Sequence, residues 1–181
     1  MLRTDKPIYK VILILNLLFI AAGIVLCVIG IASPAANAFK IISRIVAIAC
    51  LVFAGFYILG GYAKNAAKYY KVYGVLLAIK YFAGILSGST KSRTPFGTAV
   101  ITLSLVIVLV LLLSENLGRT KSLALCGLLV ILRAVILLPP VIKGIISTNF
   151  IITNLVNIDL ACLYGIMTYA KYLDKAERGT K

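Results

Sequence analysis

The sequence predicts an all-α integral membrane protein, a bundle of six transmembrane helices. Hydrophobic residues make up 62% of the 181 residues and the mean hydropathy is +1.08, whereas soluble domains contain roughly 45 to 50% apolar residues. The apolar residues also fall in long blocks that are separated by short, basic loops. Because no segment is polar enough to form a separate soluble module, residues 1–181 are expected to form a single membrane domain.

Six blocks meet or approach the roughly 17 to 25 helical residues that are needed to cross a bilayer core. The first block follows Arg3, Lys6 and Lys10 and is longer than the roughly 7 to 15 apolar residues of a cleavable signal sequence, so we expect an uncleaved span. The third block is the weakest, because it is short and carries Lys80 at its centre. The predicted spans are 9–31, 41–62, 71–88, 97–114, 122–146 and 150–169.

The distribution of lysine and arginine over the loops indicates whether the third block crosses the membrane. If it crosses and the N-terminus is cytoplasmic, the cytoplasmic side receives Arg3, Lys6, Lys10, Lys64, Lys68, Lys71, Arg119, Lys121, Lys171, Lys175, Arg178 and Lys181. The opposite side receives only Lys40, Arg44, Lys91, Arg93 and Lys143. Without that crossing most of the asymmetry disappears. We therefore predict a multi-pass protein of the inner (plasma) membrane with both termini in the cytoplasm.

The net charge of +14 favours a membrane partner over nucleic acid, since the basic residues flank apolar blocks and do not gather on a soluble face beside base-stacking aromatics. Such flanking charge orients a protein in the bilayer and attracts anionic lipid. The expected partners are therefore the lipid bilayer and its anionic lipids, together with a membrane protein partner or further copies of the chain, and no nucleic acid.

Three ionisable residues, Lys80, Arg133 and Asp159, lie near the middle of predicted spans and at about the same depth. Each charge in hydrocarbon costs roughly 2.5 to 3.5 kcal/mol on insertion scales, so we expect the three to converge on one another or on a hydrated cavity. Asp159 is the one acid in the predicted spans, and it can pair with Arg133 of the preceding span or with Lys80. Either pairing leaves one net positive charge at the midplane.

Helical spacing places Lys80 on one face with small, aromatic and hydroxylated residues, as expected for a face that packs against protein or lines a cavity. This stripe comprises Ala66, Tyr70, Tyr73, Leu77, Lys80, Gly84 and Ser87. The alternative is a lysine that snorkels along its stem to the membrane boundary.

The last span carries a second polar stripe, which either forms hydrogen bonds between helices or lines a solute pathway. It comprises Thr153, Asn154, Asn157, Ala161, Tyr164 and Thr168. Asp159 lies about 200° around the helix from Asn157, so the two side chains are expected to face different neighbours.

Pro139 and Pro140 follow Arg133 within two turns and remove two backbone donors from the predicted fifth span. The freed carbonyls need other donors in a bilayer, so a helix break that faces protein or water is expected there.

The sequence argues against catalysis. It has no histidine, which excludes histidine-based nucleophilic triads and the usual catalytic zinc sites. One membrane aspartate cannot form a catalytic carboxylate pair, and no phosphate-cradling glycine loop is present. We therefore predict no enzymatic activity, no catalytic residues, no metal site and no cofactor.

The segment Gly23-Ile24-Val25-Leu26-Cys27-Val28-Ile29-Gly30, followed by Pro34 and by a second span that contains Gly55, resembles the span, proline loop and span unit of HdeD-type acid-resistance membrane proteins. The resemblance covers the first third of the chain. It implies a small six-span membrane protein.

These observations lead to a first hypothesis, a small membrane protein that binds or passes a solute, with an anion as one candidate, at a midplane polar site. The predicted site comprises Lys80, Arg133, Asp159, Asn154, Asn157, Tyr73 and Tyr164, next to the helix break at Pro139 and Pro140. The second hypothesis is a non-transporting accessory or assembly protein that docks a partner or anionic lipid and whose buried charges only fix helix registry. A small pore-forming protein is the third.

Overall fold

The computed structural model of the chain describes residues 7–31, 38–59, 66–87, 95–114, 117–138, 142 and 148–179. This part of the chain is all α-helical, with six helices and no strand, as the sequence predicts. The helices are α1 (Pro7–Ile31), α2 (Ala38–Leu59), α3 (Ala66–Ser87), α4 (Pro95–Leu113), α5 (Arg119–Val135) and α7 (Thr148–Gly179).

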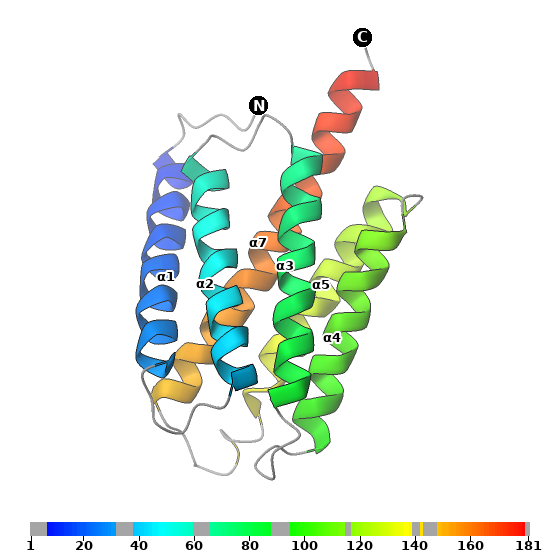
Figure 1. The fold of residues 1–181 in the computed structure, drawn as a ribbon. Coiled ribbons are helices and arrows are strands. Elements are labelled where there is room, and N and C mark those ends of the chain that lie inside the picture. Colours follow the sequence, from blue (N-terminus) through cyan, green and yellow to red (C-terminus); the bar gives the residue numbers. More distant parts are fainter. Residues whose placement is uncertain are drawn as a thin grey trace.

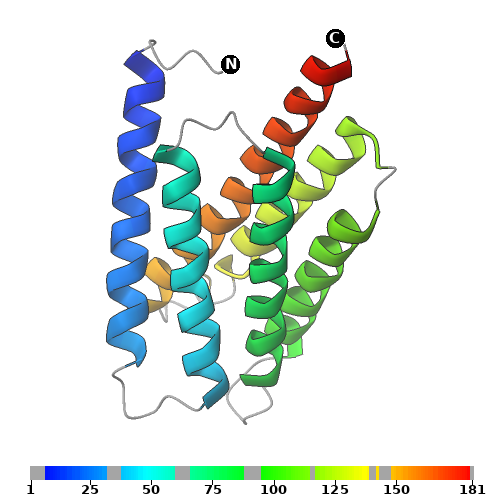
Figure 2. The same ribbon diagram turned by 45° about the horizontal axis from the view of Figure 1, so that its top comes forward.

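Successive helices run in alternating directions along the bundle (Figure 1). The start of α1 and the end of α7 therefore lie at the same end of the bundle, which we call the terminal end (Figures 1 and 2). The opposite end is formed by the last turns of α1, α3 and α5 and by the first turns of α2, α4 and α7.

The centre of the bundle is built by α3 and α7. Helix α3 contacts α2, α4 and α7, and α7 contacts α1, α2, α3 and α5. Tyr73 and Leu77 of α3 and Leu160 and Tyr164 of α7 are all fully buried. Tyr73, Leu77 and Tyr164 belong to the two stripes predicted from helical spacing, so these members of the stripes face the interior.

Tyrosine hydroxyls tie α3 to its neighbours in this core. The Tyr70 hydroxyl donates to the Leu111 carbonyl oxygen of α4 at 2.6 Å, and the Tyr73 hydroxyl donates to the Leu160 carbonyl oxygen of α7 at 3.0 Å. The Tyr164 ring stacks on the Tyr70 ring, with ring centroids 5.1 Å apart. A buried hydroxyl needs such partners. The Leu160 carbonyl has a lone pair to spare after its helical bond, and the Leu111 carbonyl lies in the last turn of α4, where carbonyls lack intrahelical partners.

The outer faces of the helices are apolar. Phe56 of α2 is 67% exposed, Phe82 of α3 is 55% exposed and Leu113 of α4 is 78% exposed. Two helical segments within the described residues, Ala67–Ser87 and Pro95–Leu113, are long and apolar enough to cross a membrane. Shorter apolar stretches occur at Ile20–Ile29 and Ile41–Tyr57.

Helix α5 ends before the C-terminal end that was predicted for the fifth span. A span over 122–146 was expected, but α5 ends at Val135, and the chain turns at Ile136 and Leu137, where the Leu137 amide donates to the Ala134 carbonyl oxygen at 3.0 Å. A helix ends readily before a proline, because the proline supplies no amide hydrogen to the preceding turn. Pro139 and Pro140 themselves lie outside the described residues.

The sixth predicted span also differs from the structure. Helix α7 runs from Thr148 to Gly179, ten residues beyond the expected end at 169. The polar residues after 169 still form helix because leaving the apolar block does not break backbone hydrogen bonding, and lysine, alanine and glutamate favour helix.

Candidate functional site: a cationic cavity

A cavity of about 250 Å³ lies between the helices, in the half of the bundle away from the terminal end. Its position follows from its lining, which includes Arg44 in the second turn of α2, Ser87 at the end of α3 and Arg133 in the last turn of α5. The described residues that line it are Gly23, Leu26, Cys27, Ser43, Arg44, Ala47, Lys80, Tyr81, Gly84, Ser87, Ile101, Arg133, Val156 and Asn157.

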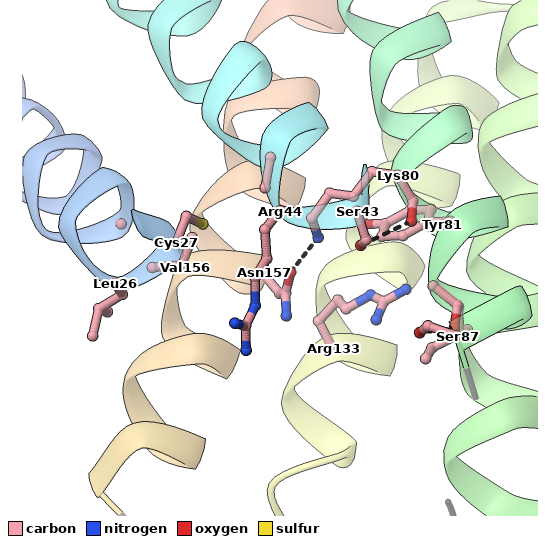
Figure 3. Close-up of a pocket in the computed structure, with 14 residues that line it drawn as sticks. Leu26, Cys27, Ser43, Arg44, Lys80, Tyr81, Ser87, Arg133, Val156 and Asn157 are labelled. Atoms are coloured by element: carbon pink, nitrogen blue, oxygen red, sulfur yellow. Dashed lines mark hydrogen bonds between the residues drawn. The ribbon is translucent and has the colours of Figure 1, made fainter. Parts of the chain in front are cut away.

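Three cationic side chains reach the cavity from three helices, Arg44 from α2, Lys80 from α3 and Arg133 from α5 (Figure 3). Lys80 is 8% exposed and Arg133 is 3% exposed. No acidic residue is among the described residues that line the cavity. The cavity wall therefore carries three positive charges without an anionic counterpart.

Lys80 is held by Asn157. Its ammonium group donates a hydrogen bond to the Oδ1 atom of Asn157 on α7 (Figure 3). The Ser43 hydroxyl of α2 donates to the backbone carbonyl oxygen of Lys80 at 3.4 Å. Because Lys80 points into the bundle and is bonded there, the snorkelling alternative does not describe it.

Arg133 and Lys80 share one aromatic ring. The guanidinium carbon of Arg133 lies 4.2 Å from the centroid of the Tyr81 ring, and the Lys80 Nζ atom lies 5.2 Å from the same centroid. Cation–π attraction between a desolvated cation and a tyrosine face offsets part of the cost of burial. Arg133 gains further from its place in the last turn of α5, because the carbonyl end of a helix dipole attracts a cation by typically 0.3 to 1 kcal/mol.

The expected ion pair of Asp159 is absent. Among the described residues Asp159 forms no salt bridge with Arg133 or Lys80, and its Oδ2 atom is buried without a hydrogen-bond partner. Asp159 does not line the cavity, whereas Asn157 does. The physical reason is the rotation of α7, because the angle of about 200° between the two residues turns Asp159 away when Asn157 faces Lys80.

The other predicted site residues lie outside the cavity. Asn154 is buried but does not line it. Tyr73 and Tyr164 lie in the hydrophobic core between α3 and α7, where the Tyr164 hydroxyl is buried without a hydrogen-bond partner. The structure thus brings together Lys80, Arg133 and Asn157, and leaves four of the seven predicted residues elsewhere.

Arg44 and Tyr81 were missed by the sequence analysis. Arg44 was assigned to the non-cytoplasmic side, but α2 begins at Ala38, which places Arg44 in its second turn. The sequence carries a signal, because Ala47, Leu51 and Ala54 follow Arg44 at helical spacing. In the structure these three residues are 3%, 0% and 0% exposed. An arginine in line with such residues faces the core.

No family model, curated protein or solved structure matches this chain. The resemblance to HdeD-type proteins therefore stays a prediction, and the function is argued from the site itself.

Proposed function

We propose that the chain is a multi-pass inner-membrane protein that binds an anionic solute in the cationic cavity, as a step in holding that solute or passing it across the membrane. The observation that carries the proposal is the convergence of Arg44, Lys80 and Arg133 on one cavity whose described lining has no acid. Uncompensated buried charges are strongly destabilising, whereas an anion would neutralise part of the charge.

The membrane part of the proposal is supported by the apolar outer surface. Soluble monomers rarely expose contiguous apolar patches above a few hundred Å². Here large apolar side chains are exposed along several helices, including Val25 and Val28 of α1, Phe56 of α2, Phe82 of α3 and Leu113 of α4. Lipid acyl chains would cover these side chains without the free-energy cost of exposing apolar surface to water.

Basic residues also favour a cytoplasmic terminal end. Lys68, Lys71, Arg119 and Lys121 are exposed and lie in the first two turns of α3 and α5, which start at that end. Arg44, near the opposite end, is only partly exposed and lines the cavity. This asymmetry agrees with the tendency of lysine and arginine to remain in the cytoplasm.

We expect the chain to stay in the membrane pellet after alkaline carbonate extraction, and a reporter fused to its C-terminus to be active in the cytoplasm. The pellet result follows from the apolar outer surface, and the reporter result from the basic terminal end. A protein released by carbonate would contradict the membrane assignment, and a reporter active only outside the cytoplasm would contradict the orientation.

Replacing Arg44 and Arg133 together by glutamine is expected to weaken anion binding by at least about 30-fold, since charge-assisted hydrogen bonds contribute about 1.5 to 3 kcal/mol each and are not fully additive. Binding is measured by calorimetry on purified protein in detergent with chloride, acetate and phosphate. Arg119→Gln is the matched control, because Arg119 is also on α5 and lies over a tyrosine ring, Tyr169, at 4.8 Å, but is exposed.

The control variant Arg119→Gln should bind anions as tightly as the unmodified protein. The double variant should still unfold cooperatively, which shows that it is folded. If no anion binds the unmodified protein, or if the folded double variant binds as well as the control, the cavity is not an anion site. The accessory-protein hypothesis would then gain, although the absence of an Asp159–Arg133 ion pair removes the simplest way for these charges to fix helix registry.

A further inference from the structure

We infer that the cavity takes a tetrahedral oxyanion of the phosphate class, either free phosphate or the phosphate group of a lipid headgroup, with Arg133 as the residue that grips two of its oxygens. This inference rests on the proposed anion-binding function and names the ligand chemistry. It comes from the hydrogen-bond donors that the folded protein leaves unused.

One edge of the Arg133 guanidinium group is unused. Its Nε and Nη2 atoms are both buried without a hydrogen-bond partner, although the residue is only 3% exposed. These two nitrogens present parallel N–H bonds in a fixed fork, which matches two oxygens of a carboxylate or phosphate. A halide is a single atom and cannot accept from both N–H bonds in this parallel geometry, so the fork favours an oxyanion.

Further unused donors belong to the same cavity. The Nη1 atom of Arg44 and the hydroxyl of Tyr81 are also buried without a partner. Together with the Arg133 fork they account for four of the six unpartnered buried side-chain atoms found among the described residues. All four can donate, and a buried unpaired donor costs about 1 to 3 kcal/mol, so a ligand that accepts from them restores what folding leaves unsatisfied.

The number of donors and charges favours phosphate over carboxylate. A carboxylate has two oxygens and one negative charge, and the Arg133 fork alone would occupy both oxygens. A phosphate group has further oxygens for Arg44 and Tyr81 and carries up to two negative charges against the three cations of the wall. Lys80 already donates to Asn157, and an ammonium group has two donors left.

The cavity size is compatible with this ligand class. A volume of about 250 Å³ accommodates a phosphate group with some bound water or a short attached segment. Leu26, Ile101 and Val156 give part of the lining an apolar character that would suit the glycerol and acyl portion of a lipid phosphate. Free phosphate and a lipid headgroup offer the same oxygens, so they are distinguished by experiment.

The test uses the full chain in nanodiscs of zwitterionic lipid, titrated calorimetrically with inorganic phosphate, acetate and chloride at constant ionic strength. We expect phosphate to bind most tightly. Arg133→Lys, which keeps the charge but not the fork, should lower phosphate affinity at least about tenfold and change chloride affinity little. Tyr81→Phe should lower phosphate affinity several-fold, while the exposed control Arg119→Lys should have no effect.

A second arm identifies the source of the phosphate group. If phosphatidic acid included in the nanodiscs competes with inorganic phosphate, the ligand class extends to lipid headgroups; if it does not, the site takes free phosphate. Either result agrees with the inference. Arg133→Lys and Tyr81→Phe are tested separately, so misfolding of one still leaves the other to test the inference.

The inference and the proposed function fail in different ways. If acetate or chloride binds as tightly as phosphate and the Arg44→Gln with Arg133→Gln variant abolishes that binding, the phosphate inference is wrong and the anion site remains. The same holds if folded Arg133→Lys and Tyr81→Phe keep full phosphate affinity. If none of the three anions binds, both are wrong.

Discussion

Gly74→Ala is expected to destabilise the bundle by about 1 to 3 kcal/mol, the usual cost of overpacking a core. A Cβ atom at Gly74 would lie 2.6 Å from the Leu112 Cδ2 atom and 2.7 Å from the Tyr164 hydroxyl oxygen. Leu112 can rotate away, but the Tyr164 ring is stacked on Tyr70 and on Tyr73, with ring centroids 5.1 and 5.9 Å away. The added methyl group must therefore displace α3 from α7.

Gly55→Ala is the matched control for this prediction. Gly55 is a buried helical glycine of α2, and a Cβ atom there would meet nothing within 4 Å. Because glycine in a helix interior costs roughly 0.5 to 1 kcal/mol relative to alanine, this variant should be neutral or slightly more stable. Reversible unfolding in mixed micelles measures both. Equal effects of the two substitutions would show that α3 and α7 do not approach each other as closely at Gly74 as the structure indicates.

The buried stripes were predictable from sequence because they depend only on local geometry. Tyr73, Leu77 and Lys80 recur at helical spacing, and a helix that forms at all places them on one face. The structure buries all three. The same reasoning applies to Asn157 and Tyr164 on α7, so element type and the inward faces needed no tertiary information.

The partners of those faces were not predictable, because they depend on where each helix ends and how it is rotated. The expected depth of Arg133 assumed a span to residue 146, whereas α5 ends at Val135 and leaves Arg133 in its last turn, next to free helix carbonyls. The expected acidic partner of Lys80 assumed that charge pairs with charge. The rotation of α7 offers Asn157 to Lys80 instead of Asp159.

Asn157→Leu is expected to destabilise the protein by about 3 kcal/mol, because it leaves the buried Lys80 ammonium without its acceptor. Leucine keeps the number and branching of the side-chain heavy atoms of asparagine and is not smaller, so the replacement opens no cavity. Lys80→Met in the same chain should recover most of the loss, since a methionine in place of the lysine needs no acceptor and removes one of the three like charges in the cavity.

The effects of Lys80→Met and Asn157→Leu on stability are therefore expected to be coupled. Lys80→Met, Asn157→Leu and the double variant form a double-mutant cycle whose coupling energy, measured by unfolding in mixed micelles, should be about 1.5 to 3 kcal/mol. Strictly additive effects would mean that the Lys80–Asn157 hydrogen bond does not form in the folded protein. A stable double variant that still binds anions through Arg44 and Arg133 would assign Lys80 a structural and electrostatic role and leave ligand contact to the two arginines, which the unused donors of those side chains already indicate.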